Sequence, residues 1–199
     1  VASLYDRNSL IDIIKKTCKE IFVPITVGGG IRNLKDIQNA LNAGADKVAI
    51  NSQAFRDMQF ICDAVEAFGS QAIVGSIVCT QNRNSWESFI DNAKHRTNIN
   101  AIEWAKELES NGVGEIIVSS IDRDGIQSGF DEDLIYKISQ KINLPVIAAS
   151  GAGSVDHIIS VCQKTKCDAV AVGSMLHYEK DSIQNIKLKM HNIGLEVRI

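Results

Sequence analysis

Short apolar segments alternate along the chain with longer amphipathic segments. The apolar segments are rich in β-branched residues, and they predict strands at residues 21–27, 47–50, 72–78, 115–119, 145–148 and 169–172. The amphipathic segments predict helices near residues 10–21, 34–43, 58–68, 101–110, 132–141, 155–163 and 183–191. Such alternation indicates a parallel sheet, and strands that are apolar throughout imply that the sheet is buried on both faces. The stretch 79–98, rich in Asn, Ser and charge, is expected to be irregular.

The chain also contains an internal repeat. Residues 24–30, PITVGGG, are similar to residues 145–151, PVIAASG, and residues 46–52 are similar to residues 168–174. Two predicted strands precede the second copy and none precedes the first. The pattern therefore predicts an α/β fold of the (β/α)8 TIM type that lacks its first two βα units, with six parallel strands present. We expect residues 1–199 to form a single barrel domain, incomplete at its N-terminal end. The alternative, a six-stranded open sheet, would expose two hydrophobic edges.

Composition narrows the function classes. The net charge of −3 argues against a nucleic-acid surface. No apolar run reaches the roughly 20 residues that a membrane-spanning helix needs, and no signal peptide is evident, so we expect a cytoplasmic protein. The five cysteines show no CxxC spacing, which predicts reduced, mostly buried thiols, with no metal site and no cofactor.

Two glycine clusters stand where a strand passes into a helix. Gly28–Gly30 and Gly151–Gly153 let the backbone approach an anion, with the free N–H groups of the helix start pointing at a phosphate. The next strand after each cluster ends in a small polar pair, Asn51-Ser52 or Gly173-Ser174. The repeat predicts a ligand with a phosphate at each end, and the alternative is two structural turns.

The roles expected for one loop and for two charged residues depend on which end of the strands they occupy. The loop that contains Asp122, Asp124 and Gly125 follows a strand. We expect it either to supply a carboxylate for proton transfer or to be simply a solvated turn. Lys47 and Glu115 each open a strand, so they belong to the opposite face, and a stabilising charge on the rim is the ordinary interpretation.

At these residues the sequence resembles the cyclase subunit of imidazole glycerol phosphate synthase. The similar stretches include VPITVGGGIRNLKDIQNALNAGADKVAINSQAF, EWAKELESNGVGEIIVSSIDRDGIQSGFD and LPVIAASGAG. The resemblance implies an eight-stranded barrel that works with a glutaminase subunit as a heterodimer. Using ammonia from that subunit, it would convert a bis-phosphorylated ribonucleotide into imidazole glycerol phosphate and an aminoimidazole ribonucleotide.

The resemblance also implies roles for individual residues. One phosphate would be held by Gly30, Asn51 and Ser52, and the other by Gly125, Gly151, Gly173 and Ser174. Asp124, with Asp122 beside it, would lie in the active-site loop. Lys47 and Glu115 match charged residues that ring the ammonia entrance, on the face where the glutaminase docks.

One catalytic position differs from the family. Val78 stands where the family has its second catalytic aspartate, and the first belongs to the strand that this chain lacks. A sister group resembles the cyclase but provides ammonia for acetamidino-sugar formation in lipopolysaccharide and O-antigen synthesis, with a nucleotide-sugar substrate. That function, and a non-catalytic scaffold that binds a phosphate ligand, remain alternatives.

Overall fold

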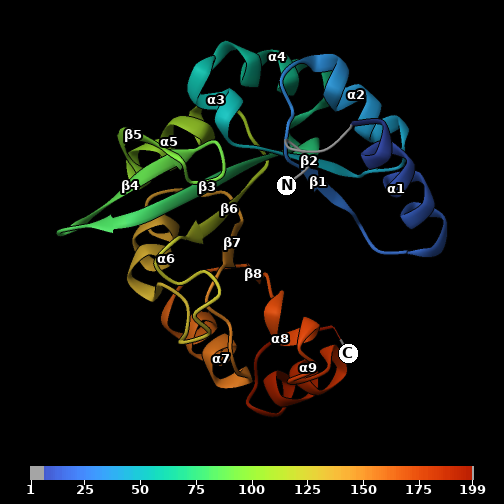
Figure 1. The fold of residues 1–199 in the computed structure, drawn as a ribbon. Helices are drawn as coiled ribbons and strands as arrows, with labels where there is room; N and C mark the ends of the chain where they lie inside the picture. The colour runs from blue at the N-terminus through green and yellow to red at the C-terminus, as the bar shows by residue number, and fades with distance from the viewer. Residues whose placement is uncertain (1–6, 199) are drawn as a thin grey trace.

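The structure, a computed structural model that describes residues 7–198, is built on six parallel strands that curl into a half-barrel (Figure 1). In sheet order the strands are β1 (Thr26–Gly28), β2 (Lys47–Ile50), β3 (Ile73–Asn82), β6 (Glu115–Ser120), β7 (Val146–Ala149) and β8 (Ala169–Val170). Each strand pairs in parallel with the next one along this path. The predicted α/β barrel-type fold with six parallel strands is confirmed.

Helices connect the strands and cover the outside of the sheet. They are α1 (Arg7–Glu20), α2 (Leu34–Asn42), α3 (Ser52–Arg56), α4 (Gln59–Phe68), α5 (Ala101–Ser110), α6 (Glu132–Ser139), α7 (Val155–Lys164), α8 (Ser174–His177) and α9 (Ile183–Asn192), with a short 3-10 turn at Ser70–Ala72. The side chains of Asn33, Asn100 and Ser154 cap α2, α5 and α7 by accepting hydrogen bonds from backbone N–H groups of the first turn.

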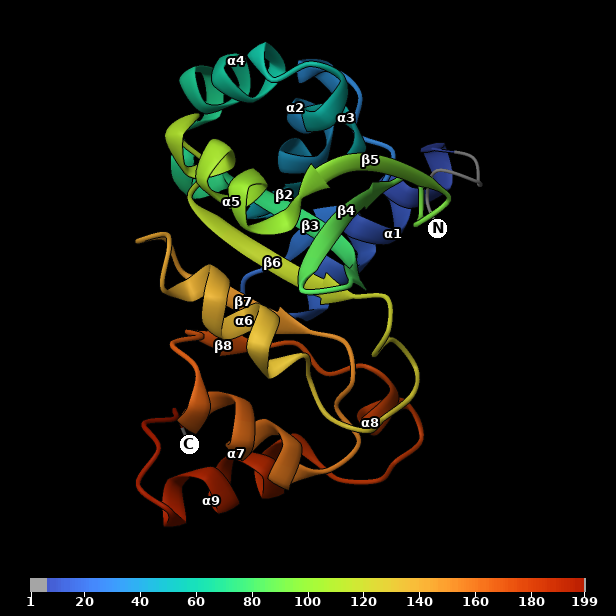
Figure 2. The ribbon, with the colours of Figure 1, turned by 90° about the vertical axis from the view of Figure 1, so that its left-hand side faces the viewer.

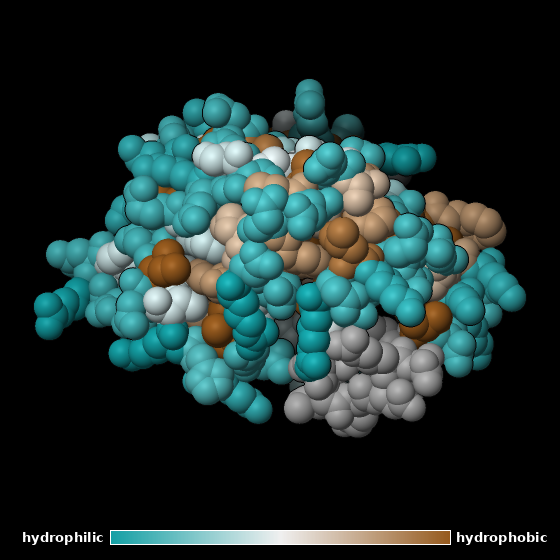
Figure 3. Space-filling model, turned by 90° about the horizontal axis from the view of Figure 1, so that it is seen from above, coloured by the Kyte–Doolittle hydropathy of each residue, from teal (hydrophilic) through white to brown (hydrophobic). Residues whose placement is uncertain are grey.

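Seen from above, the outer surface is largely hydrophilic, with hydrophobic side chains in a band between polar ones (Figure 3). No helix within residues 7–198 is both long and apolar enough to cross a bilayer.

The core lies between the strands and these helices. Ile73 and Ile77 of β3, Ile116 of β6 and Leu108 of α5 are fully buried. Gly75 lets α5 approach the sheet closely, because a Cβ atom there would lie 2.9 Å from Leu108 Cδ1. Strands β3 and β6 therefore form the centre of the packing.

The expectation of an irregular segment at residues 79–98 is wrong. Strand β3 runs on to Asn82 and forms an antiparallel sheet extension with β4 (Ser85–Ile90), which pairs in turn with β5 (His95–Asn100). The extension lies beneath α3 in both ribbon views (Figure 1, Figure 2). Strand β4 carries no alternating pattern, because Glu87 and Ser88 are buried together with Trp86 and Phe89. The signal that normally marks a half-buried strand was therefore missing.

The two strands at the ends of the path are shorter than predicted. Residues 21–25 and 171–172 are not in strands, although residues 21–27 and 169–172 have strand-like composition. Each end strand has a single partner on the path, and the segment before β1 is solvent-exposed, with Phe22 95% and Val23 65% exposed. Helices α3 and α8 were not predicted because five and four residues are too few to show helical periodicity.

Replacing Ile116 by Ala should destabilise the protein strongly. The side chain is fully buried on β6, which pairs with both β3 and β7. Loss of its methyl groups should lower the free energy of unfolding by about 2–5 kcal/mol, measured by urea denaturation. Ile13→Ala is the control, because Ile13 is 60% exposed on α1. Equal effects of the two changes would contradict this description of the core.

Candidate functional site

A cavity of about 680 Å³ opens at the C-terminal ends of β1, β2 and β3. It is lined by the first glycine cluster, by the residues that follow β2, by inward-facing residues of β3 and by the tip of the β4–β5 hairpin: Gly28, Gly29, Gly30, Ile31, Arg32, Ala49, Ile50, Asn51, Ser52, Gln53, Arg56, Ser76, Val78, Asp91 and Asn92. The parallel register brings these segments together, because it aligns the ends of all three strands. Ligand sites at the C-terminal edge are typical of such barrels.

The glycine cluster forms one wall of this cavity. Gly29 and Gly30 adopt φ values of 100° and 73°, a conformation that residues with a side chain rarely adopt. A Cβ atom at Gly28 would lie 3.1 Å from the Cβ of Ala49 on β2, so glycine at this position lets β1 and β2 lie close together. The cluster leads into α2, and this arrangement of backbone is suited to an anion.

Asn51 and Ser52 follow β2, which pairs directly with β1, and they contact the hairpin. The Asn51 side-chain amide donates to the Phe89 carbonyl at 3.3 Å, and Ser52 Oγ accepts a hydrogen bond from the Asp91 backbone N–H at 2.9 Å. Asn51 Oδ1 is buried and has no hydrogen-bond partner in the structure. The structure thus places Gly30, Asn51 and Ser52, the residues expected at one phosphate, in a single cavity.

Three charged residues among the described lining of this cavity, Arg32, Arg56 and Asp91, were not anticipated from the sequence. Arg56, four residues after Ser52 on the same short helix, donates from Nη2 to both carboxylate oxygens of Asp91, at 2.6 and 2.7 Å. The hydrogen bond from Arg56 lowers the pKa of Asp91, so its carboxylate stays charged at a lower pH than an ordinary aspartate does. Ser52 and Arg56 are four residues apart, so a helix there places them on the same face, and this spacing was the one available signal for Arg56. Its partner Asp91 could not be predicted, because strands β4 and β5 on either side of it were not predicted.

Val78 also lines the cavity. It faces the same side of β3 as Ser76, and its backbone pairs with Phe89 of β4 on one side and Ser119 of β6 on the other. Among the lining residues that the structure describes, Asp91 is the one carboxylate, and it is held by Arg56. At the position of Val78 the cavity therefore has an apolar surface and no proton-transfer group.

The second glycine cluster packs against the neighbouring loop. A Cβ atom at Gly151 would lie 2.2 Å from the Gly129 carbonyl oxygen, and one at Gly153 would lie 2.1 Å from the Gln127 carbonyl oxygen. The Gly153 N–H is directed at Nδ1 of His157, 3.2 Å away. Close packing alone is enough to require glycine at both positions.

The other residues expected at a second phosphate stand on the loops after β6 and β8. Gly125 and Gly173 are exposed, and a Cβ atom at either would meet nothing within 4 Å. Ser174 begins α8 directly after Gly173. These residues, like Gly151, lie outside the cavity that contains Gly30.

The two candidate aspartates differ in their surroundings. Asp122 is held by the end of β3, because its carboxylate accepts from Thr80 Oγ1 and from the Gln81 N–H, each at 2.6 Å. Asp124 is exposed in the following turn. Neither lines the cavity around Gly30.

A third aspartate in this region was not singled out from the sequence. Asp131 caps α6 through the Leu134 N–H at 3.1 Å and accepts from Trp86 Nε1 at 2.7 Å. It therefore connects the hairpin to the start of α6. Burial, followed by the charges of Asp131 and Asp122, raises the pKa of the nearby Cys79 thiol, which is consequently protonated and unreactive.

None of the five cysteines lines the cavity around Gly30. All five cysteines are free, as expected, but Cys79 alone is fully buried and the other four are partly exposed. Within residues 7–198, no group of three or more His, Cys, Asp or Glu side chains is arranged to hold a metal ion.

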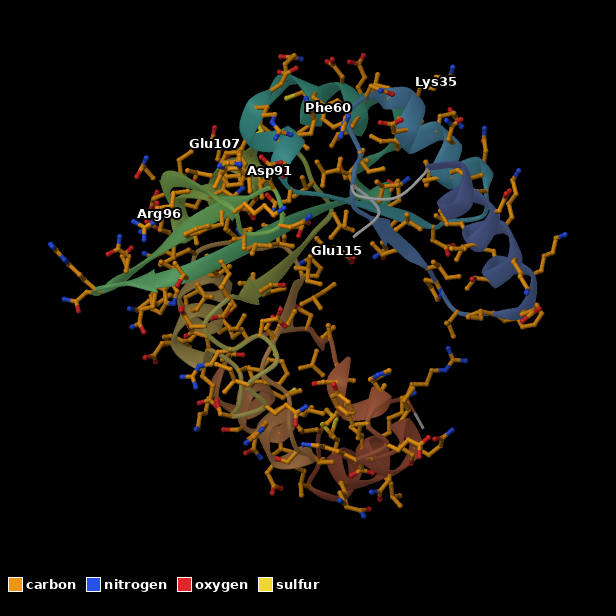
Figure 4. The ribbon with its side chains drawn as sticks, viewed as in Figure 1. Lys35, Phe60, Asp91, Arg96, Glu107 and Glu115 are labelled. Carbon is orange, nitrogen blue, oxygen red and sulfur yellow. The ribbon has the colours of Figure 1, made fainter. Side chains whose placement is uncertain are left out.

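Lys47 and Glu115 form an ion pair at the other end of the sheet. They are the first residues of β2 and β6, and Lys47 Nζ lies 2.5 Å from Glu115 Oε2 across the start of β3. Glu115 is 15% exposed and Lys47 31% exposed. In Figure 4, Glu115 lies well apart from Asp91 of the hairpin tip. The two residues are thus at strand starts, as expected, facing away from the cavity.

Comparisons with known proteins agree with this architecture. The family model described as "Histidine biosynthesis protein" matches residues 1–182. The chain is 43% identical over 194 residues to the imidazole glycerol phosphate synthase subunit HisF of Bacillus cereus strain G9842, and equally so to that of strain ATCC 10987 / NRS 248. Each alignment covers 97% of this chain and 77% of the relative. The chain therefore belongs to the histidine biosynthesis protein family and is a HisF-like barrel, similar to the cyclase subunit of imidazole glycerol phosphate synthase.

Proposed function

We propose that this chain is the barrel subunit of a glutamine-dependent synthase of the imidazole glycerol phosphate synthase type. It binds a bis-phosphorylated ribonucleotide at the C-terminal ends of its strands, in the cytoplasm, and a glutaminase subunit supplies ammonia from the opposite face. The observation that carries the proposal is the cavity that combines the Gly28–Gly30 turn with Asn51 and Ser52. Family membership and 43% identity to HisF proteins support the same reaction type.

In this proposal the two ends of the sheet have different tasks. Gly30, Asn51 and Ser52 bind one phosphate, and Gly125, Gly151, Gly173 and Ser174 bind the other. Asp122 and Asp124 stand on the loop after β6, within the same edge of the sheet. Asp124 is the more available for proton transfer, because both carboxylate oxygens of Asp122 already accept hydrogen bonds. Lys47 and Glu115 surround the point where ammonia enters.

A second candidate function is favoured by Val78. A barrel that lacks a carboxylate at this position of the cavity retains the means to bind phosphate and to pass ammonia, without the group needed for cyclisation. That combination suits a subunit that provides ammonia for acetamidino-sugar formation on a nucleotide-sugar. Binding of the bis-phosphorylated ribonucleotide with no turnover in either pathway would instead indicate a scaffold subunit.

The decisive experiment measures turnover of the bis-phosphorylated ribonucleotide by the complete protein with saturating ammonium, which bypasses the glutaminase. We expect slow turnover because Val78 cannot transfer a proton, and general acid–base catalysis contributes about 10²–10⁴-fold. Val78→Asp should restore about that factor. Val78→Asn, similar in size but not ionisable, is the matched control. Wild-type turnover of about 1–10³ s⁻¹, the range typical of enzymes, would show that another group supplies the proton.

Lys47→Ala should impair the use of glutamine but not the use of ammonium. The change leaves the Glu115 carboxylate without its ion-pair partner at the proposed docking face, and we expect glutamine-dependent turnover to fall about tenfold. Ammonium-dependent turnover should stay within about twofold, because the cavity lies at the other end of the strands. Lys106→Ala is the control, since it breaks a comparable pair with Glu103 on the exposed face of α5. Equal losses with both nitrogen sources would place Lys47 in the substrate site instead.

A further inference from the structure

Arg56 and Asp91 form an ion pair at the rim of the cavity that no role assigned so far explains. We propose that Arg56 is a further phosphate ligand of this cavity, and that Asp91 is an internal competitor which the ligand phosphate displaces. The inference rests on the proposed function, since it names an additional specificity-determining contact in the same site. It also assigns the β4–β5 hairpin a role in admitting the ligand.

The geometry of the pair suits an exchange of anions. A guanidinium binds a carboxylate and a phosphate in the same planar manner, through parallel N–H donors. In this pair the single nitrogen Nη2 of Arg56 donates to both oxygens of Asp91, at 2.6 and 2.7 Å, and the same guanidinium can turn to donate to the oxygens of a phosphate. Both side chains line the cavity together with Gly30 and Ser52.

The pair can be exchanged at little cost. Arg56 is 48% exposed and Asp91 33% exposed, so the interaction is partly screened by solvent and contributes little net stability. A phosphate monoester carries more negative charge than a carboxylate and has three acceptor oxygens. It therefore competes well for Arg56, and its charge repels the Asp91 carboxylate that it replaces.

The hairpin tip is built so that Asp91 determines its position. Asp91, Asn92 and Ala93 adopt φ values of 54°, 58° and 62°, a left-handed turn that is unfavourable for three consecutive residues with side chains. Asp91 fixes this turn to α3 through its backbone N–H on Ser52 Oγ and its carboxylate on Arg56. Figure 4 shows Asp91 where the hairpin meets α3. Displacing the carboxylate would remove one of these two contacts and free the tip to move.

The charges that face this position favour the phosphate over the aspartate. Arg32 lines the same cavity from the loop before α2, so within residues 7–198 two guanidinium groups and one carboxylate border it. When a phosphate replaces Asp91 at Arg56, the cavity keeps both positive groups for the ligand. The alternative is a purely structural clamp, in which Arg56 and Asp91 merely fasten the hairpin.

The two interpretations differ in the sign of one effect. If Asp91 competes with the ligand, removing its charge strengthens phosphate binding, whereas removing Arg56 weakens it. If the pair is only a clamp, the two changes act in the same direction, because either one breaks the same contact.

The test is a titration of the complete protein with D-ribose 5-phosphate, followed by NMR shifts, at low ionic strength. Arg56→Gln should raise the dissociation constant about tenfold or more, and Arg56→Lys should recover part of the loss. Asp91→Asn should lower the dissociation constant about fivefold. Lys164→Gln is the matched control, because it breaks an exposed pair with Glu132, 2.8 Å apart, outside the cavity, and should leave binding unchanged. Unphosphorylated ribose should not distinguish wild type from any variant.

The outcomes separate this inference from the proposed function. Weaker binding by both Arg56→Gln and Asp91→Asn, or no change in either, would overturn the inference. If the wild type still binds ribose 5-phosphate, the proposed phosphate site is unaffected by that result. Failure of the wild type to bind ribose 5-phosphate would overturn both. Thermal unfolding of the two variants is measured in parallel, and only opposite effects on binding at similar stability support the displacement.

Discussion

The structure depends on the parallel pairing of β3 with β6 at the centre of the sheet. Six consecutive residue pairs, from Val74–Glu115 to Cys79–Ser120, set the register of these two strands, and the fully buried side chains of Ile77 and Ile116 belong to them. Because the six strands of this path run the same way, their starts lie at one end of the sheet, and the two glycine clusters that follow β1 and β7 lie at the other. The separation of the Lys47–Glu115 pair from the Gly30 cavity follows directly from this register.

The sequence allowed the parallel architecture to be predicted because buried parallel strands are apolar throughout and the helices between them are amphipathic. The limits of α5, residues 101–110, were predicted without error. The glycine turn at residues 28–30 and the polar residues Asn51 and Ser52 were found from their position after a strand, and the structure places them in one cavity. Such local signals are sufficient where the chemistry of a site comes from a strand end.

The hairpin could not be predicted, for a physical reason. Strand β4 buries Glu87 and Ser88 beside Trp86 and Phe89, so neighbouring positions do not alternate between apolar and polar. The Arg56–Asp91 contact joins residues 35 apart in the chain, and it depends on where that hairpin folds back. For the second glycine cluster the sequence did not show why glycine is needed. The structure gives one reason, since residues 127–129 approach Gly151 and Gly153 too closely for a Cβ atom.

Strand β3 belongs to two ladders at once, and Val78 stands where they overlap. Its backbone is fixed by β6 on one side and by β4 on the other, while its side chain points into the cavity. Because the backbone at this position is held from both sides, the side chain can be replaced by another while the main chain stays in place. Divergence within a family can therefore exchange a reactive group for an inert one at this point, or the reverse, by a single substitution. The barrel would survive the exchange, and the reaction that it supports would be the part that evolves.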